Sequence, residues 1–194
     1  MEKRKIGIDI DEVVVEFVNP YLKIYNQKYN RKKRFEDINN FDLWIPLGIT
    51  KEDAFEITYK FYDSEDFDNI PFVNGAREGI KRLTKDNELF FITSRPLKIK
   101  EKTEQFFRKN FPELNYEIIF SGDIWGSQEK KKPVICKRLC IENIIEDNIN
   151  YAFDCAKSGI ITYLLNKPWN QNGNLPKNII RVKSWNEILE RLES

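Results

Sequence analysis

From Gly75 onward the sequence alternates between helical and extended patterns, and this alternation limits the possible folds strongly. The expected helices span 76–85, 97–110, 133–140 and 150–157, with a last one capped by Ser184, and the expected strands span 88–93, 116–120, 143–146, 160–165 and 179–182. Strands that alternate with helices pair in parallel, and the helices cover both faces of the sheet. The sequence therefore predicts an α/β fold, a Rossmann-like parallel sheet sandwiched by helices.

An earlier strand is expected in the segment Ile6–Val15, where an apolar β-branched run is interrupted by Asp9 and Asp11. Such a run is typical of a buried strand, and here it delivers two carboxylates at its C-terminal end. Because side chains alternate along a strand, both aspartates begin on the same side of it. Two acids in one small cavity repel each other, which indicates a bound cation.

A long insertion separates this strand from the alternating region. Residues 17–72 are mainly helical in pattern, including a helix over 50–62 with Thr50 as its N-cap. This insertion is far longer than an ordinary connection between a strand and a helix. We expect residues 1–16 and 73–194 to form the α/β core domain and residues 17–72 a small cap domain over the acidic loop.

Composition excludes several classes of protein. The 194 residues carry a formal net charge of +1, so nothing in the balance demands a nucleic acid polymer or an anionic membrane as partner. No apolar run approaches the roughly 18 residues of a membrane-spanning helix, and three cysteines do not suggest a disulfide framework. These features predict a soluble, cytoplasmic protein and leave its oligomeric state open, a homodimer included.

Polar residues follow three of the expected strands. They are Asp9 and Asp11 after the first, Thr93-Ser94-Arg95 after the second and Glu146-Asp147 after a later one. In a parallel sheet these ends lie at one edge, where ligands bind. Each group alone has a simpler explanation as a turn or helix cap, but their combination favours a functional site. Two acidic pairs together would make an oxygen-rich site suited to Mg²⁺.

Together with a lysine upstream of Glu146, these residues resemble the four motifs of the haloacid-dehalogenase-like (HAD) phosphohydrolases. More narrowly, Ile8–Val13, Phe91–Pro96 and Ile144–Asn148 resemble the 5'(3')-deoxyribonucleotidase group and its bacterial relatives. A helical cap inserted after the first motif agrees with that group. The resemblance implies a HAD-like core and hydrolysis of a phosphomonoester.

The resemblance also implies a role for each acid. Asp9 would be the nucleophile that forms an aspartyl-phosphate, and Asp11 the general acid and base. Mg²⁺ would be held by the carboxylate of Asp9, the backbone carbonyl of Asp11 and the carboxylate of Asp147. Glu146 stands where an aspartate is more common, and it would reach the metal directly or through water.

The remaining roles concern the phosphate. Thr93 would donate its hydroxyl and Ser94 its backbone N–H to phosphate oxygens, and a lysine would balance the negative charge. Lys132, just before the helix that begins with Pro133, is the preferred lysine, with Lys131 next and Lys130 also adjacent.

Several residues have two interpretations each. Arg95 either contacts substrate or covers the turn at Pro96. Phe17 and Trp44 either stack on a nucleobase or pack in the core of the cap. Glu12 stands where many relatives have glycine, and its role is open.

The expected function is that of a Mg²⁺-dependent 5'-nucleotidase acting on (deoxy)nucleoside monophosphates. A phosphatase for a sugar phosphate or another small metabolite is the alternative enzyme, because the cap sets specificity. A HAD-fold binding module without catalysis is the alternative of another class.

Overall fold

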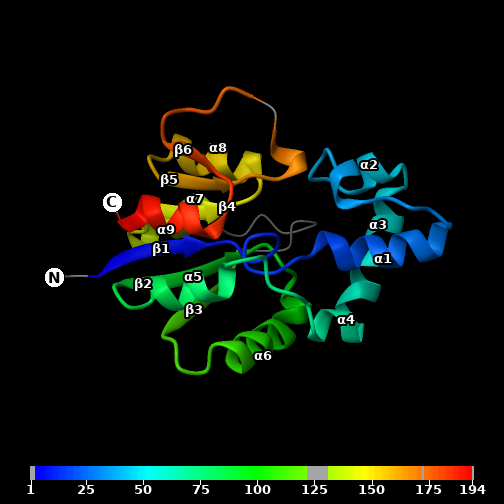
Figure 1. The fold of residues 1–194 in the computed structure, drawn as a ribbon, viewed down its shortest axis with the longest axis horizontal. Helices are drawn as coiled ribbons and strands as arrows, with labels where there is room; N and C mark the ends of the chain where they lie inside the picture. The colour runs from blue at the N-terminus through cyan, green and yellow to red at the C-terminus, as the bar shows by residue number, and fades with distance from the viewer. Residues whose placement is uncertain (1–2, 122–130, 172, 194) are drawn as a thin grey trace.

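The computed structural model describes residues 3–121, 131–171 and 173–193. Its centre is a six-stranded, fully parallel sheet in the order β3-β2-β1-β4-β5-β6 (Figure 1). The strands are β1 (Arg4–Ile8), β2 (Asn87–Thr93), β3 (Tyr116–Phe120), β4 (Asn143–Glu146), β5 (Ile161–Leu165) and β6 (Ile179–Val182). The predicted α/β fold with a Rossmann-like parallel sheet is confirmed.

Strand β1 lies in the middle of the sheet. Its Ile8 pairs with Phe91 of β2 on one side and with Ile145 of β4 on the other. The strand order reverses between β1 and β4, which is the place where ligands bind in open sheets of this kind. The residues after β1 are therefore flanked by the ends of β2 and β4.

Helices of three or more turns and several shorter ones surround the sheet. They are α1 (Val18–Tyr29), α2 (Trp44–Leu47), α3 (Lys51–Tyr62), α4 (Glu65–Asp68), α5 (Ala76–Leu83), α6 (Lys100–Asn110), α7 (Lys132–Leu139), α8 (Ile149–Lys157) and α9 (Trp185–Glu193), with 3₁₀ turns η1 (Phe35–Asp37), η2 (Leu97–Ile99) and η3 (Pro168–Asn170). The side chain of Thr50 accepts from the backbone N–H of Asp53, so the predicted cap of α3 is confirmed. In the described part of the chain, none of these helices is long and apolar enough to cross a membrane.

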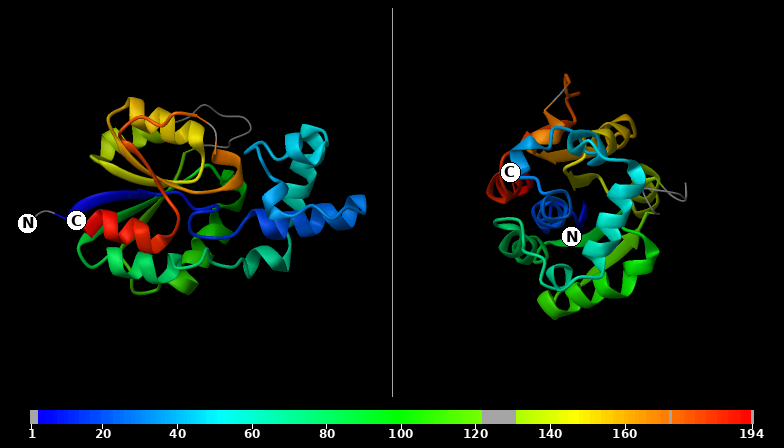
Figure 2. Two further views of the ribbon diagram at one scale, coloured as in Figure 1. Left: turned by 45° about the horizontal axis from the view of Figure 1, so that its top comes forward. Right: turned by 90° about the vertical axis from the view of Figure 1, so that its right-hand side faces the viewer.

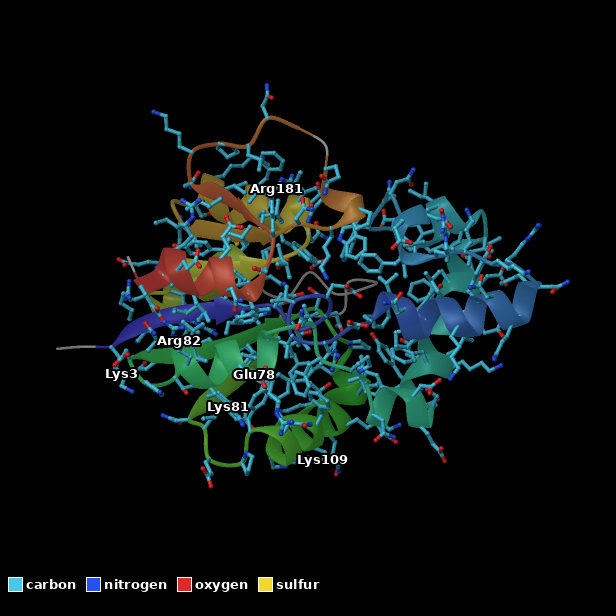
Figure 3. All side chains as sticks on the ribbon, in the orientation of Figure 1. Lys3, Glu78, Lys81, Arg82, Lys109 and Arg181 are labelled. Carbon is cyan, nitrogen blue, oxygen red and sulfur yellow. The ribbon has the colours of Figure 1, made fainter. Side chains whose placement is uncertain are left out.

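The sheet divides the core into two apolar layers. Because side chains alternate along β2, Phe91 packs on one face with Ile80 of α5, Phe107 of α6 and Trp185 of α9. Its neighbours Phe90 and Ile92 face the other side, where the buried residues of α7 and α8 are Ile135, Cys136 and Cys155. Exposed charges such as Glu78 and Lys81 lie on the outer side of α5 (Figure 3). Both faces are thus covered, as the alternation predicted.

Residues 17–72, here called the cap segment, contain α1 to α4. The segment lies beyond the carboxyl ends of the strands, at the opposite end of the molecule from both termini (Figures 1 and 2). The chain enters and leaves it side by side, since Val15 forms a bridge with Phe72 and Glu16 N–H donates to Pro71 O at 2.8 Å. The short helices α2 and α4 and the turn η1 were not expected from the sequence.

Candidate active site

A cavity of about 410 Å³ separates the strand ends from the cap segment. From the core it is lined by Asp9, Asp11, Glu12, Ser94, Arg95, Asp147, Asn148, Asn150, Tyr151 and Trp169, and from the cap segment by Phe17, Val18, Tyr21, Phe41, Asp42, Leu43, Trp44, Lys51, Ala54, Thr58 and Tyr62. All the lining acids except Asp42 therefore lie on the core side, and most of the aromatic rings lie on the cap side.

Three buried carboxylates meet at the floor of this cavity. Asp9 follows β1, and its backbone N–H donates to Ile145 O over 2.9 Å, which holds it beside the end of β4. One carboxylate oxygen from each of Asp9, Glu146 and Asp147 lies within 4.8 Å of the others. The adjacency of β1 and β4 thus brings together acids that are about 137 residues apart in sequence.

Lys132 inserts its ammonium group into this acidic cluster. As the first residue of α7 it is 2% exposed, and its Nζ lies 2.6 Å from Asp9 Oδ1 and in contact with Glu146 Oε1. The Nζ also lies 4.8 Å from the centre of the Tyr151 ring. Lys131 is exposed, and Lys130 lies outside the described residues. Of the adjacent lysines that the structure describes, Lys132 is therefore the one at the carboxylates.

The electrostatics of the cluster favour a bound cation. Burial raises the pKa of the Asp9 carboxyl to about 7, although Lys132 opposes this, and burial together with Glu146 and Asp9 holds the pKa of Asp147 well above its usual range. Burial alone would lower the pKa of Lys132, but the negative charges of Asp9 and Glu146 have the larger effect, so the pKa of Lys132 is raised. A divalent cation among these oxygens would stabilise the ionised forms, so the donor set fits a hard metal such as Mg²⁺.

Glu146 and Asp147 differ in what their oxygens contact. Glu146 Oε1 pairs with Lys132, while its Oε2 accepts from the backbone N–H groups of Asp147 and Asn148 at 3.0 Å each. Asp147 Oδ2 accepts only one described bond, from Trp169 Nε1 at 2.9 Å. Asn148, not Asp147, caps α8 by accepting from Asn150 N–H. Asp147 is thus the more available ligand of the pair.

Asp11 is held by a guanidinium group. Arg95 donates through Nε to Asp11 Oδ2 at 2.9 Å and through Nη2 to Oδ1 at 2.6 Å. The arginine is 3% exposed, contacts Thr103 Oγ1 and lies 5.0 Å from the ring centre of Phe67 in α4. A two-pronged pair of this kind fixes the orientation of the carboxylate. Arg95 also lines the cavity, so its predicted contact with substrate stays a prediction.

The two hydroxyl residues that follow β2 lie at different depths. Thr93 is 1% exposed, and its Oγ1 accepts from the backbone N–H of Arg95 at 3.2 Å. Ser94 lines the cavity, and its hydroxyl contacts Ser121 and Tyr151 at 3.2 and 3.3 Å. Their predicted contacts with phosphate remain predictions.

The two aromatic candidates of the cap segment, Phe17 and Trp44, both line the cavity, and their stacking on a nucleobase stays a prediction. Phe17 packs against Tyr21, Phe61 and Tyr62 with ring centres 5.3 to 6.2 Å apart, and it also lines the cavity. Trp44 also lines the cavity, and Lys51 Nζ lies over its ring, 5.3 Å from the ring centre. Phe17 therefore belongs both to the core of the cap segment and to the cavity wall, whereas Trp44 is placed at the cavity wall beside Lys51.

Two further features were missed in the sequence. Glu12, which is buried, accepts from Val18 N–H at 2.7 Å and from Lys167 Nζ at 2.8 Å, so it joins the start of α1 to the segment after β5. Trp169 contacts Asp147 from the same segment. The run Asn170-Gln-Asn-Gly-Asn174 has the composition of a polar surface loop, yet Asn170 is fully buried.

Comparison with known proteins decides the family. A family model described as "5' nucleotidase, deoxy (Pyrimidine), cytosolic type C protein" matches residues 3–192. The chain belongs to this family, the cytosolic type C nucleotidases. The predicted resemblance to the HAD phosphohydrolases and to the deoxyribonucleotidase group is confirmed.

Relatives of this nucleotidase family match along nearly their whole length. A nucleotidase of Clostridium acetobutylicum is 26% identical over 193 residues, covering 97% of this chain and 93% of the relative. A 5'(3')-deoxyribonucleotidase of Bacillus subtilis is 24% identical over 197 residues, covering 98% and 99%. A HAD hydrolase of Bacillus subtilis solved with bound magnesium has the same fold, with 16% identity, full coverage of both chains and a TM-score of 0.62. The type C nucleotidase family makes this chain an enzyme of the phosphatase class, as predicted.

Proposed function

We propose that this enzyme hydrolyses (deoxy)nucleoside 5'-monophosphates in a Mg²⁺-dependent reaction that passes through an aspartyl-phosphate on Asp9. The observation that carries the proposal is the placing of Asp9 between Lys132 and Asp147, beside a cavity that Asp11 also lines. Residues 1–16 and 73–194 form the core domain in this proposal, and residues 17–72 form the cap domain. The family description as cytosolic supports a cytoplasmic location.

The metal would be held by the carboxylates of Asp9 and Asp147 and by the backbone carbonyl of Asp11, with Glu146 directly or through water. An all-oxygen set of buried acids suits Mg²⁺ better than a softer metal. The ion would neutralise phosphate charge so that an anionic nucleophile can approach. Glu146 already holds Lys132 and two backbone N–H groups, so water is the simpler route for its contribution.

In the proposed reaction, the Asp9 carboxylate attacks phosphorus, and the departing alkoxide takes a proton from Asp11. Asp11 then removes a proton from the water that hydrolyses the aspartyl-phosphate. Arg95 pairs with both oxygens of the ionised Asp11 carboxylate beside the cavity, and one of these two bonds opens when that oxygen carries the proton for the alkoxide. Lys132, Thr93 and the Ser94 backbone N–H stabilise negative charge on the nucleophile and the phosphate.

The cavity supports a nucleoside-sized substrate. Its volume of about 410 Å³ falls within the roughly 300–1,000 Å³ of small-ligand sites. The rings of Phe17 and Trp44 offer apolar surface for a base, whereas a sugar phosphate would leave these rings unused. The family description and the B. subtilis relative also support a deoxynucleotide.

Two measurements test the proposal. Replacing Asp9 with Asn should abolish Mg²⁺-dependent hydrolysis of an aryl phosphate, because the amide cannot act as the nucleophile; unchanged turnover would refute the role of Asp9. A panel of phosphomonoesters should give higher kcat/KM for deoxynucleoside monophosphates than for sugar phosphates. Equal values would favour the metabolite phosphatase, and no turnover of any phosphate by the wild type would favour the binding module.

A further inference from the structure

The segment Lys167–Asn170 after β5 carries polar and aromatic side chains that are buried without belonging to the sheet. Trp169 is 7% exposed and Asn170 is fully buried. Asn170 is braced from two sides: its Oδ1 accepts from Lys167 N–H at 3.1 Å, and Arg181 of β6, labelled in Figure 3, donates to its Oδ1 and O at 2.5 and 2.6 Å. The 3₁₀ turn η3 is therefore held firmly against the sheet.

This segment holds Asp147 through two separate bonds. Trp169 Nε1 donates to Asp147 Oδ2 at 2.9 Å, and Asn170 Nδ2 donates to Asp147 O at 2.7 Å. The first bond fixes the rotation of the carboxylate, and the second fixes the backbone that carries it. A carboxylate held at one oxygen in this way presents a defined set of lone pairs to a cation.

The same segment also contacts the cap side of the molecule. The Trp169 ring packs edge-on against Phe35 of η1, with ring centres 5.3 Å apart. Lys167 Nζ lies 5.5 Å from the Phe35 ring centre and donates to Glu12, whose other oxygen accepts from the first N–H of α1. The segment therefore contacts the cap segment directly at η1 and is joined to its first helix through Glu12.

We propose that Trp169 is a positioning residue for the metal ligand Asp147, and that Phe35 of the cap segment keeps Trp169 in place. This inference rests on the proposed function, because it takes Asp147 as a ligand. The edge-on contact with Phe35 limits the rotation of the indole that makes this bond, so the cap segment helps to set the orientation of Asp147. Metal affinity and cap position are thereby linked.

The decisive variant is Trp169→Phe, which removes the N–H and keeps an aromatic ring. Loss of a hydrogen bond to a metal ligand lowers metal affinity by about 10- to 100-fold. Titration of the metal-free enzyme with Mg²⁺ by calorimetry should show this loss. Saturating Mg²⁺ should restore most of the hydrolysis rate, because the ligands themselves remain.

Trp185→Phe is the matched control. Trp185 is also buried, and its Nε1 donates to Val13 O at 2.8 Å, so the variant loses the same kind of bond but none to Asp9, Glu146 or Asp147. Its Mg²⁺ affinity should stay within about twofold of the wild type. An equal loss in both tryptophan variants would mean general loosening of the fold and would overturn the proposal.

Asp147→Asn separates this inference from the proposed function. Lost Mg²⁺ binding in Asp147→Asn with wild-type affinity in Trp169→Phe would refute the positioning role alone. Wild-type affinity in Asp147→Asn, or no Mg²⁺ binding by the wild type, would refute the metal site and the positioning role together.

Phe35→Leu tests the cap contact and serves if Trp169→Phe does not fold. Because coupling through a packed neighbour is weaker than a direct bond, the expected loss of Mg²⁺ affinity is about 2- to 10-fold. Phe55→Leu is the control. It replaces a ring of α3 whose centre lies 6.0 Å from Lys51 Nζ, and it should bind Mg²⁺ with the affinity of the wild type. Unchanged affinity in Phe35→Leu would refute the link to the cap segment.

Discussion

At the scale of single residues, Lys132 is a buried ammonium group with two carboxylate partners. Its side chain is 1% exposed, that of Glu146 is fully buried and that of Asp9 is 11% exposed. Taking such charges out of water is costly, and only their mutual pairing offsets the cost. The lysine therefore matters to stability as well as to charge in the active site.

Lys132→Met should lower the free energy of unfolding by about 3–5 kcal/mol in metal-free protein, because it leaves buried carboxylates without a counter-ion. Urea denaturation in the presence of EDTA measures this. Lys131→Met is the control, since that neighbour is exposed and its loss should change stability by less than about 0.5 kcal/mol. The double variant Lys132→Met/Glu146→Met should recover part of the lost stability. If Lys132→Met were as stable as Lys131→Met, the prediction would be wrong.

At the scale of elements, the turn between β1 and α1 depends on Glu12. This residue has φ of 60°, a left-handed conformation that side chains other than glycine, asparagine and aspartate rarely adopt. Its carboxylate compensates by accepting the first N–H of α1 and the ammonium of Lys167. Burial raises the pKa of Glu12, while Lys167 opposes this. A glycine here would ease the backbone but lose both contacts.

Glu12→Ala should lower the free energy of unfolding by about 3 kcal/mol, because it leaves Lys167 buried without its carboxylate and removes the cap of α1. Glu16→Ala is the comparison: that glutamate, in the same connection, makes only an exposed described bond to Asn19 at 3.3 Å. Its loss should cost less than about 1 kcal/mol. Chemical denaturation measures the free energy of unfolding of both variants. If Glu12→Ala were as stable as Glu16→Ala, the prediction would be wrong.

At the scale of the whole molecule, the acidic cluster links stability to pH and to metal. Burial gives Asp9 a pKa of about 7 in the folded state against 3.8 for the free side chain. Between these values the folded state binds more protons than the unfolded state. The stability that Asp9 contributes is therefore present below about pH 4 and is lost as the pH rises through about 7.

In metal-free protein, the unfolding free energy of the wild type minus that of Asp9→Asn should fall as the pH rises from about 4 to about 7. The difference between the two proteins isolates Asp9 from other titrating groups. Mg²⁺ should stabilise the wild type more at pH 7 than at pH 5, because the cation favours the ionised carboxylates. Thermal unfolding across this range measures both effects, and a difference that is flat or rises with pH would refute the prediction.

Also at this scale, the fold and the closeness of the acidic residues could be predicted from the local sequence pattern. Alternation of strands and helices predicts a parallel sheet, and a parallel sheet brings its strand ends together. Asp9, Thr93 and Asp147 could therefore be placed at one edge without any knowledge of side-chain packing. Lys132 could be preferred because it directly precedes a helix that begins with proline.

Contacts between distant side chains could not be predicted in this way. Arg95 reaches Asp11, and Lys167 reaches Glu12, across 84 and 155 residues of sequence. No periodicity marks such partners, because they depend on the final arrangement of loops and not on the repeat of a strand or helix. For the same reason the sequence indicates only a polar loop at Asn170, although this residue is buried and hydrogen-bonded to Lys167, Asp147, Leu165 and Arg181.

The side-by-side crossing at Val15 and Phe72 has a consequence for how such enzymes diversify. An insert whose two ends are joined by backbone bonds adds little closure entropy when it grows or shrinks. The backbone pairing at this crossing therefore lets the insert change in length, whereas an insert that lacks Phe35 would lose the ring that packs against Trp169 beside Asp147. A chimera that carries another relative's insert between residues 16 and 73 should keep the phosphate chemistry and acquire a new substrate range.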